Sequence, residues 1–561
     1  MDHGPHGIQA ESHRPVVYGR NGMVAAGHPL AAQAGVRTLQ RGGNAVDAAV
    51  AVAAALNVVE PAMSGAAGDG FSMVYRRERG TVEVMNATGP APQAATREAY
   101  LPAGIPMKGI RSVSVPGLVD GWLGIHGRHG RLKLAEVFEP AIDLAANGFP
   151  VSHKLAQAMA GDPSLREFPS SAAIFAPQGR TPTAGELLVQ RELAVTFQRL
   201  ASDGRDYFYR GPIARAIVAC SERYGGLLTF EDFARYEARW QEPISAGYRD
   251  WTVYEAPPNS SGHVLLQELN VVEQFDLKSL GCNSAAAIHL MVEAKKLAFA
   301  DRERYLADPD WADVPIAGLL SKEYARERVR SINLDRAADA VTAGDPWKYQ
   351  GGSLRPASPR RGSRQQEDTT CFAVVDGEGN AVCQLQSLQS GFGSGLVADG
   401  TGLLLNNRMT YWHLEEDHVD CLQPGKRVRH TMNPVMVFRG NDLVLVCGTP
   451  GADTQVQTNL QVVTHTLDFG LTVAEAVEAP RWRHIQNPME STVPHTCTDA
   501  LTLEARFPAA AVEELRRRGQ PVQLLGAWEG TGSEVMIQVD PSNGALAGAG
   551  DPRRDGYAIG Y

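Results

Sequence analysis

Residues 368–390 read DTTCFAVVDGEGNAVCQLQSLQS, and the fold is predicted from this segment first. Apolar residues alternate with other residues in TTCFAVVD, the turn-forming residues GEGN follow, and the alternation resumes in AVCQLQSLQS. A period of two on both sides of a short turn that contains Gly and Asn is typical of a β-hairpin. The sequence therefore predicts a hairpin whose first strand begins at Thr369.

The segment before this hairpin has a different composition. Residues 335–368 contain few aliphatic side chains and many Pro, Gly, Ser and Arg residues, which is typical of a linker. We therefore expect a linker at 335–368, between a first part of the chain, residues 1–368, and a second part, residues 369–561.

Apolar patterns on the N-terminal side predict mostly helices. A short strand and two helices are expected between residues 22 and 61, and the second helix, 45–59, reads AVDAAVAVAAALNVV. That helix is shorter than the ~20 residues needed to cross a bilayer and contains Asp47 and Asn57, so we expect it to be buried in the protein. Residues 112–300 carry apolar side chains mostly at the three- and four-residue spacing of helices.

The C-terminal side repeats the hairpin pattern. NPVMVF, RGND and LVLVCG at 433–448 predict a second hairpin, and GTPGAD then leads into a helix at 454–467. Thr472 and Glu475 form the T-x-x-E pattern of a capping box at the start of another helix. A strand is expected in EVMIQVD, and the end of the chain, 548–561, is expected to be rich in turns.

Composition and charge exclude several functions. The 561 residues contain 53 Lys+Arg and 63 Asp+Glu, a formal net charge of −10, and 43% of residues are hydrophobic. This is the composition of a globular protein, and no nucleic-acid partner is expected. The seven cysteines are widely spaced without a C-x-x-C pair, and the N-terminus lacks a signal-peptide pattern. We therefore expect reduced thiols, a cytoplasmic location and no membrane association.

The junction of linker and strand suggests a chemistry. A threonine that opens a strand after a linker is the arrangement a self-cleaving N-terminal-nucleophile hydrolase requires. The Thr369 hydroxyl would attack the Asp368 carbonyl, and hydrolysis of the resulting ester would free an α-amino group that serves as general base. The alternative is an ordinary strand start, because Thr is favoured in strands.

GTPGAD, residues 448–453, lies between an apolar strand and a helix. The backbone N–H groups of Gly451 and Ala452 at such a helix entry can converge on an oxyanion. The alternative is an ordinary turn between a strand and a helix.

Other motifs give no positive sign of a cofactor. HLEEDHVDC, residues 413–421, concentrates metal-capable side chains, but its spacing matches no standard zinc or calcium site and favours an acidic solvated loop. No G-x-G-x-x-G, G-x-x-x-x-G-K-[ST] or G-x-S-x-G pattern occurs, and the arginines of RPASPRRGSR are interpreted as part of the linker. We expect neither a metal nor a cofactor.

The chain resembles the γ-glutamyltransferase family over nearly its whole length. The matching segments are GGNAVDAAVAVAAAL, GDGF, PPNSSGHVLLQELNVVEQFDL, TTCFAVVDGEGNAV, FGSG, LLLNNRM, GTPGAD, LTVAEAVEAPRW and DPRRDGYAIGY. The resemblance implies an α+β fold, the four-layer αββα sandwich of N-terminal-nucleophile hydrolases. It also implies a proenzyme cut between Asp368 and Thr369 into a large chain, 1–368, and a small chain, 369–561, which remain intertwined as a heterodimer forming one folded unit.

Catalytic roles follow from the resemblance position by position. Thr369 is similar to the family's nucleophile, and its freed amine to the base. Ser387 stands where the family has a threonine that supports the nucleophile's hydroxyl. Gly451 and Ala452 stand at the paired oxyanion glycines, a tolerable change if only backbone N–H groups are used.

The resemblance is weaker in the substrate pocket. Thr88 stands for an arginine that holds the glutamyl α-carboxylate, and Tyr411 for the aspartate that pairs with the α-amino group. Neither replacement can fill the original role, since a hydroxyl does not replace a guanidinium and a phenol carries no negative charge. The segment 409–434 is also shorter than in typical bacterial transpeptidases, which suggests that a lid loop is missing.

Further pocket residues are implied on the small chain. Gln389 stands for an asparagine, Arg408 for a glutamine, and the pair His430 and Thr431 for two serines. Arg408, with Arg429 as a second candidate, could hold the terminal carboxylate of an acyl chain that lacks an α-amine.

This pattern is expected of the glutaryl-type cephalosporin acylase and amidohydrolase branch. The resemblance thus implies a self-processing amidohydrolase that cleaves a γ-glutamyl-like or glutaryl-type small-molecule amide through an acyl-enzyme on Thr369, with water as acceptor. Two enzymatic alternatives are a true γ-glutamyltransferase or glutathione hydrolase and a small-amide hydrolase of the oxamate type. A third alternative is an uncleaved binding protein without catalytic activity.

Overall fold

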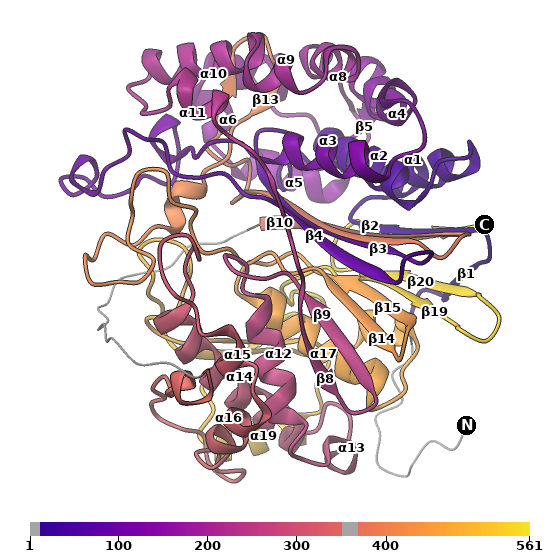
Figure 1. Ribbon diagram of the computed structural model, residues 1–561, viewed down its shortest axis with the longest axis vertical. Coiled ribbons are helices and arrows are strands. Elements are labelled where there is room, and N and C mark those ends of the chain that lie inside the picture. The colour runs from indigo at the N-terminus through magenta and orange to yellow at the C-terminus, as the bar shows by residue number, and fades with distance from the viewer. Residues whose placement is uncertain (1–11, 351–367) are drawn as a thin grey trace.

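Two facing β-sheets form the centre of the protein, and a layer of helices covers the outer face of each (Figure 1). The computed structural model describes residues 12–350 and 368–561. The arrangement is the αββα sandwich expected from the sequence. The basic stretch at 355–364 lies outside the described residues.

The first sheet, called the β10 sheet, has seven strands in mutually antiparallel pairs. In order across the sheet they are β21 (Tyr557–Gly560), β2 (Gly22–Ala26), β10 (Asp368–Asp376), β11 (Ala381–Gln389), β3 (Asp69–Arg76), β4 (Thr81–Ala87) and β7 (Arg239–Gln241). β10 and β11 are the predicted hairpin at the centre of this sheet, so that prediction is confirmed.

The second sheet, called the β15 sheet, also has seven strands. In order they are β1 (Val17–Gly19), β20 (Leu546–Gly550), β19 (Val535–Val539), β15 (Asp442–Gly448), β14 (Val435–Arg439), β9 (Trp251–Glu255) and β8 (Ile244–Tyr248). The second predicted hairpin, β14 with β15, lies at its centre.

One helical layer packs on the β10 sheet. It consists of α1 (Pro29–Gln40), α2 (Ala45–Val59), α3 (Leu118–His129), α4 (Leu134–Asn147), α5 (His153–Gly161), α6 (Ser164–Glu167), α7 (Pro169–Phe175), α8 (Arg191–Asp203), α9 (Arg205–Tyr209), α10 (Pro212–Arg223) and α11 (Phe230–Ala234). Every residue of α2 is buried, as predicted from its continuous apolar sequence.

The other layer packs on the β15 sheet. It consists of α12 (Gly262–Val272), α13 (Leu277–Leu280), α14 (Ala285–Tyr305), α15 (Ile316–Leu319), α16 (Lys322–Val329), α17 (Thr454–Leu467), α18 (Val473–Glu478) and α19 (Ala509–Arg517). α17 has the predicted bounds, and the capping box between Thr472 and Glu475 is present at the start of α18.

Small elements complete the chain. Three minor sheets are formed by β5 (Phe149–Pro150) with β6 (Leu187–Leu188), by β12 (Val397–Ala398) with β13 (Leu403–Leu404), and by β16 (Trp482–Ile485), β17 (Ala500–Glu504) and β18 (Val522–Leu525). The 3-10 helices are η1 (Arg97–Ala99), η2 (Ile110–Ser112), η3 (Pro346–Tyr349) and η4 (Arg408–Tyr411).

Two sequence expectations need correction. The end of the chain contains two strands, β20 and β21, because its small and aromatic residues pair with β19 and β2 in opposite sheets. The first half of the expected linker also packs on the protein. The Gly344 N–H donates to the buried Asp301 carboxylate at 2.8 Å, and η3 lies against Leu319 and Tyr324.

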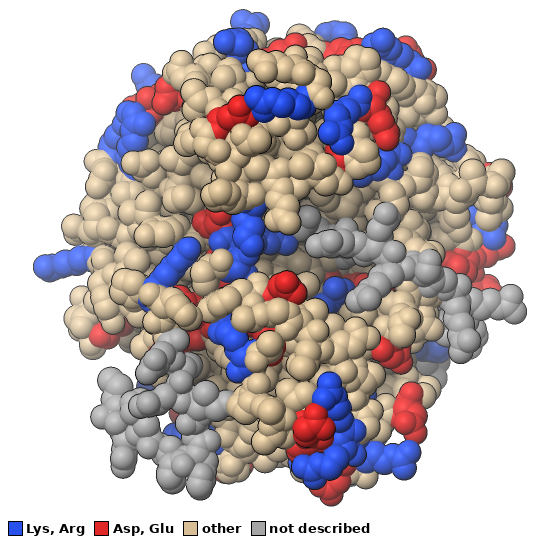
Figure 2. All heavy atoms as spheres, turned by 180° about the vertical axis from the view of Figure 1, so that it is seen from behind, with Lys and Arg blue, Asp and Glu red and all other residues tan. Residues whose placement is uncertain are grey.

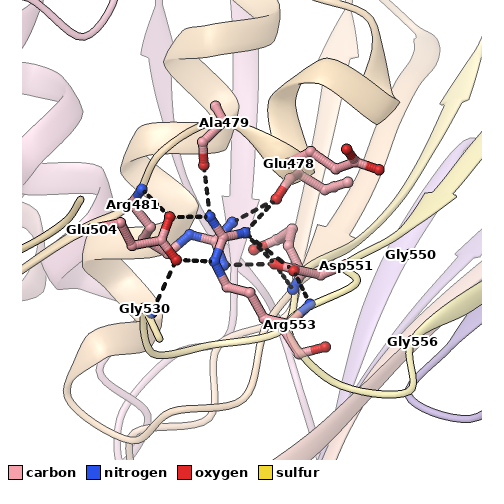
Figure 3. A network of polar contacts seen from close by, with 12 residues as sticks. Glu478, Ala479, Arg481, Glu504, Gly530, Gly550, Asp551, Arg553 and Gly556 are labelled. Atoms are coloured by element: carbon pink, nitrogen blue, oxygen red, sulfur yellow. Dashed lines mark hydrogen bonds and ion pairs between the residues drawn. The ribbon is translucent and has the colours of Figure 1, made fainter. Parts of the chain in front are cut away.

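The terminal segment DPRRDGY forms a buried network between β20 and β21 (Figure 3). The Arg553 guanidinium donates to both oxygens of Glu504, each at 2.7 Å, and to Asp551 at 3.1 Å. Arg481 donates to the same Asp551 at 2.7 Å. All four side chains are buried, so the alternation of charges is what makes their burial tolerable.

Charge on the surface is mixed. On the face drawn in Figure 2, basic and acidic side chains are interspersed among neutral ones, and many of them adjoin a partner of opposite sign. Within the described residues, every helix is too short or too polar to span a lipid bilayer. The seven cysteines, all of them in the described part, form no disulfide there.

Candidate active site

Polar side chains line up along one end of the β10 sheet. Thr369 lies at the start of β10, Ser387 near the end of β11, Asp69 at the start of β3, and Thr88 directly after β4. Ser387 and Asp69 are direct partners in the register. Side chains alternate between the faces of a strand, and the residues two positions further into β10, β11 and β3 lie in the core between the two sheets: Cys371, Leu385 and Phe71. Thr369, Ser387 and Asp69 therefore face the β15 sheet.

A β-bulge shapes the strand pair around Thr369. Asp368 pairs with Gln389 whereas Thr370 pairs with Gln386, so β11 has one extra residue here. Bulges of this kind re-aim side chains at functional sites. Gln389 accordingly has a positive φ of 95°, and its N–H donates to the Ser387 hydroxyl at 2.7 Å.

Thr369 is itself almost completely buried, at 3% exposed. Its carbonyl oxygen accepts a hydrogen bond of 3.4 Å from Arg554, the neighbour of the network arginine in the DPRRDGY segment. The next residue points to the opposite face of the sheet, where the Thr370 hydroxyl donates to Glu60 at 2.6 Å. The end of α2 and the C-terminal segment thus both hold the start of β10.

The turn at residues 448–453 approaches this strand from the β15 sheet. A Cβ placed on Gly448 would lie 2.7 Å from the Cys371 sulfur, so only glycine allows the two sheets to meet two residues from Thr369. Gly451 and Ala452 both have positive φ, 119° and 46°. Among the described residues, neither of their buried amides has a hydrogen-bond acceptor. Two adjacent unsatisfied N–H groups are what an oxyanion site needs.

Asp453 anchors this turn from its C-terminal side. One carboxylate oxygen accepts from the Arg302 guanidinium and from the Ser491 hydroxyl, and the other accepts the Ser491 N–H at 2.7 Å. Burial alone would raise the pKa of Asp453, but Arg302 and Arg429 hold it below its ordinary value. The charged Asp453 side chain therefore anchors the backbone directly after Gly451 and Ala452.

The predicted pocket residues Arg408, Tyr411, His430 and Thr431 lie together beside Asp69. Arg408 Nε donates to Asp69 at 3.1 Å, and the Arg408 guanidinium lies over the Tyr411 ring, 4.7 Å from its centroid. The Tyr411 hydroxyl is 3.2 Å from the Thr431 hydroxyl. His430 Nε2 lies 3.6 Å from the Asp69 carboxylate. Burial, and secondly Arg408, lowers the pKa of His430 to about 4, so this imidazole is neutral at neutral pH.

The other predicted pocket residues have protein partners. The Thr88 hydroxyl donates to Asn86 at 2.7 Å. Gln389 donates through its side chain to the Thr492 hydroxyl at 2.9 Å. Arg429 was predicted as a second carboxylate-binding group. Its guanidinium instead donates to the buried Glu303 at 2.7 Å, whereas Arg408 donates to Asp69.

Asp69 is the site residue that the sequence interpretation missed. Its carboxylate is fully buried, accepts the Gly89 N–H at 2.9 Å and joins Arg408 to His430. The only sequence signal was the GDG at 68–70, where an aspartate follows a loop of small residues at the start of a strand. That signal does not show which residues will lie opposite it.

The segment 413–421 differs from the solvated loop expected there. Residues 415–417 are exposed as expected, but His413 and Asp420 are buried. His413, His418 and Glu303 bring their metal-capable atoms within 4.8 Å of one another. His418 Nδ1 accepts the Asp420 N–H at 3.0 Å, so its proton lies on Nε2, which faces Glu303 at 3.1 Å. A protonated nitrogen is not a metal ligand.

Comparisons with known proteins find similar sequences and structures over nearly the whole chain. The family model described as Gamma-glutamyltranspeptidase matches residues 31–561. The glutathione hydrolase-like YwrD proenzyme of Bacillus subtilis is 38% identical over 97% of this chain and 99% of its own length. The acylase ACY 1 proenzyme of Pseudomonas sp. strain SE83 is 36% identical over 96% of this chain and 94% of its own length. The crystal structure of cephalosporin acylase from Bacillus halodurans superimposes with a TM-score of 0.87 at 35% identity, covering 100% of this chain and 99% of that one.

Proposed function

The chain belongs to the gamma-glutamyltranspeptidase family, and from this premise we propose that it is a self-processing amidohydrolase whose nucleophile is Thr369. Its substrate would be a γ-glutamyl-like or glutaryl-type amide, with water as the acceptor. The observation that carries the proposal is the approach of the turn at 448–453 to β10: Gly448 lies against Cys371, two residues from Thr369, and the amides of Gly451 and Ala452 have no acceptor among the described residues.

The processing step would begin at the bond between Asp368 and Thr369. The Thr369 hydroxyl oxygen attacks the Asp368 carbonyl carbon, the C–N bond breaks, and the acyl group moves from nitrogen to oxygen. Water then cleaves the ester, which leaves a carboxylate on Asp368 and a free amine on Thr369. Products of residues 1–368 and 369–561 are expected.

The catalytic cycle would use the same groups. The free amine takes the proton of the Thr369 hydroxyl, whose oxygen attacks the substrate carbonyl. The Gly451 and Ala452 amides stabilise the oxyanion, and the proton passes to the leaving amine. Water then attacks the acyl-enzyme ester and restores the hydroxyl. Ser387, whose hydroxyl accepts the Gln389 N–H, would orient the nucleophile.

Intact-mass measurement of the purified protein tests the first step. We expect two chains from the wild type and one uncut chain from Thr369→Ala, whereas Thr369→Ser should still be cut because it keeps a hydroxyl. A wild-type protein that remains uncut and inactive would favour the binding-protein alternative. A panel of γ-glutamyl, glutaryl and oxamate amides, with and without a dipeptide acceptor, then separates hydrolysis from transpeptidation.

A further inference from the structure

Resting on the proposed function, we propose that Asp69 is a specificity-determining residue that makes the acyl pocket electroneutral and binds the ammonium group of the acyl donor. The acyl group favoured by such a pocket carries an ammonium together with its carboxylate. An acyl group with a lone carboxylate, such as glutaryl, is then the poorer donor.

Distance along the sheet places Asp69 at the far end of an acyl chain. Asp69 lies two strands from β10, because Ser387 of β11 is its direct partner. Neighbouring strands are ~4.8 Å apart, which puts Asp69 ~10 Å from Thr369 along the row. A five-carbon acyl chain spans ~5 Å between its first and last carbons, and the two side chains cover the rest. The α-end of a chain esterified to Thr369 therefore reaches Asp69 and Arg408.

The charges at that end cancel. Arg408 donates to Asp69 at 3.1 Å, and both side chains are at most 2% exposed. Neighbouring His430 is neutral at neutral pH, and the charged groups that act on it are Arg408 and Asp69. A single carboxylate brought into this pair would leave one negative charge without a partner, and such a charge is costly when buried. A carboxylate with an ammonium adds no net charge.

Unused hydrogen-bonding capacity lies on both sides of the pair. Arg408 Nη2 is buried and has no partner among the described residues, which leaves a donor for a substrate carboxylate. The Asp69 carboxylate accepts from Gly89 and Arg408, so it retains acceptor capacity for an ammonium. Neither ring nitrogen of His430 makes a hydrogen bond in the described part of the chain, since Nε2 lies 3.6 Å from the Asp69 carboxylate. Buried polar atoms of this kind are rarely left unsatisfied, so a polar group of the substrate is expected between them.

The position of Asp69 also changes how Tyr411 is interpreted. Tyr411 carries no charge, and its ring lies against the Arg408 guanidinium while its hydroxyl faces Thr431. The negative partner of an ammonium is therefore supplied from β3 of the large chain rather than from η4. Tyr411 instead limits the positions that Arg408 can adopt.

Three p-nitroanilides test the inference: γ-glutamyl, glutaryl and butyryl, which share the same four-carbon chain and differ in the ammonium and carboxylate at its end. The first carries both charges, the second a lone carboxylate and the third none. We expect the wild type to have a higher kcat/KM for γ-glutamyl than for glutaryl by ~10- to 100-fold, since hydrogen bonds to charged groups contribute at that level. Turnover that depends on Thr369 but favours glutaryl would overturn the role of Asp69 while leaving the proposed function in place.

Asp69→Asn provides the second measurement. It removes the negative charge and keeps the size, so the ratio of γ-glutamyl to glutaryl kcat/KM should fall by about tenfold or more. Butyryl turnover and self-cleavage report whether the site is otherwise intact. A ratio that does not change in a cut, butyryl-active variant would also overturn the inference. If Asp69→Asn does not fold, the wild-type ratio alone still decides, and absence of all turnover would refute the proposed function instead.

Discussion

Asp453→Asn tests how the turn at residues 448–453 holds its two amides. One oxygen of Asp453 accepts from Arg302 and the Ser491 hydroxyl, and the other accepts the Ser491 N–H at 2.7 Å. Asparagine keeps the shape but replaces one acceptor by a donor. The new NH₂ group must then face a donor, either the Arg302 guanidinium or the Ser491 amide.

The structure sets the size of the effect. Asp453 and Arg302 have side chains only 2% and 1% exposed, and removing one partner of a buried ion pair costs about 3–5 kcal/mol. The αL conformation of the neighbouring Ala452, with φ 46°, is itself unfavourable by roughly 1–2 kcal/mol. The free energy lost with the buried ion pair therefore exceeds the free energy that holds Ala452 in the αL conformation. Ala452 can then relax, and its amide turns away from the oxyanion. Loss of one oxyanion donor lowers kcat by about 100- to 1000-fold.

We therefore expect Asp453→Asn to lower kcat by about 100-fold with little change in KM, because the amides act on the developing charge. The assay is steady-state hydrolysis of an anilide by the cut protein, with urea unfolding in parallel. Glu293→Gln is the matched control, since it breaks the buried 2.7 Å ion pair between Glu293 and Lys296. Both residues lie on α14, the helix that also carries Arg302. The control should lower stability and leave kcat unchanged. An equal loss of stability with an unchanged kcat in Asp453→Asn would refute the reasoning.

Three further outcomes follow from buried groups. Arg553→Met removes the guanidinium shared by Glu504 and Asp551, so urea unfolding should show a loss of about 3–5 kcal/mol, and a loss below about 1 kcal/mol would contradict the role of this network. Ala452→Gly should keep kcat and raise stability by up to about 1 kcal/mol, because glycine accepts φ 46°; a tenfold fall in kcat would show that the methyl group matters. Burial, and secondly Arg481, lowers the pKa of His465 to about 4 from 6.5. The unfolded chain then binds a proton that the folded one does not, so stability falls by up to about 3 kcal/mol as the pH drops from 6.5 to 4, and urea midpoints at pH 7 and 5 should differ less in His465→Gln.

The local elements could be predicted because their signals are local. The alternation in 369–390 and the turn GEGN specify β10 and β11 without reference to the rest of the chain, and α17 was given by its apolar period. The strands β20 and β21 were missed because LAGAG and YAIG have few β-branched side chains. Their conformation is set by pairing with β19 and β2.

The site could be predicted only in part, for the same reason. Thr369 and the turn at 448–453 stand out as motifs, but the importance of Asp69 depends on contacts with Gly89 and Arg408, 20 and 339 residues away in sequence. Nothing in the spacing indicates that Arg429 is directed to Glu303. Side chains that acquire their role through long-range pairing are visible only once the sheets are assembled.

The order of strands in the two sheets has a kinetic consequence. In the β10 sheet, β2 of the first part of the chain lies between β21 and β10 of the second part, and the β15 sheet also contains strands from both. A cut before Thr369 would leave two molecules that share both sheets. Unfolding would then release two separate molecules, so refolding would become a second-order reaction. The midpoint of the unfolding transition would therefore depend on protein concentration. The persistence of the dilute mature protein would be governed by its unfolding rate rather than by an equilibrium with the unfolded state.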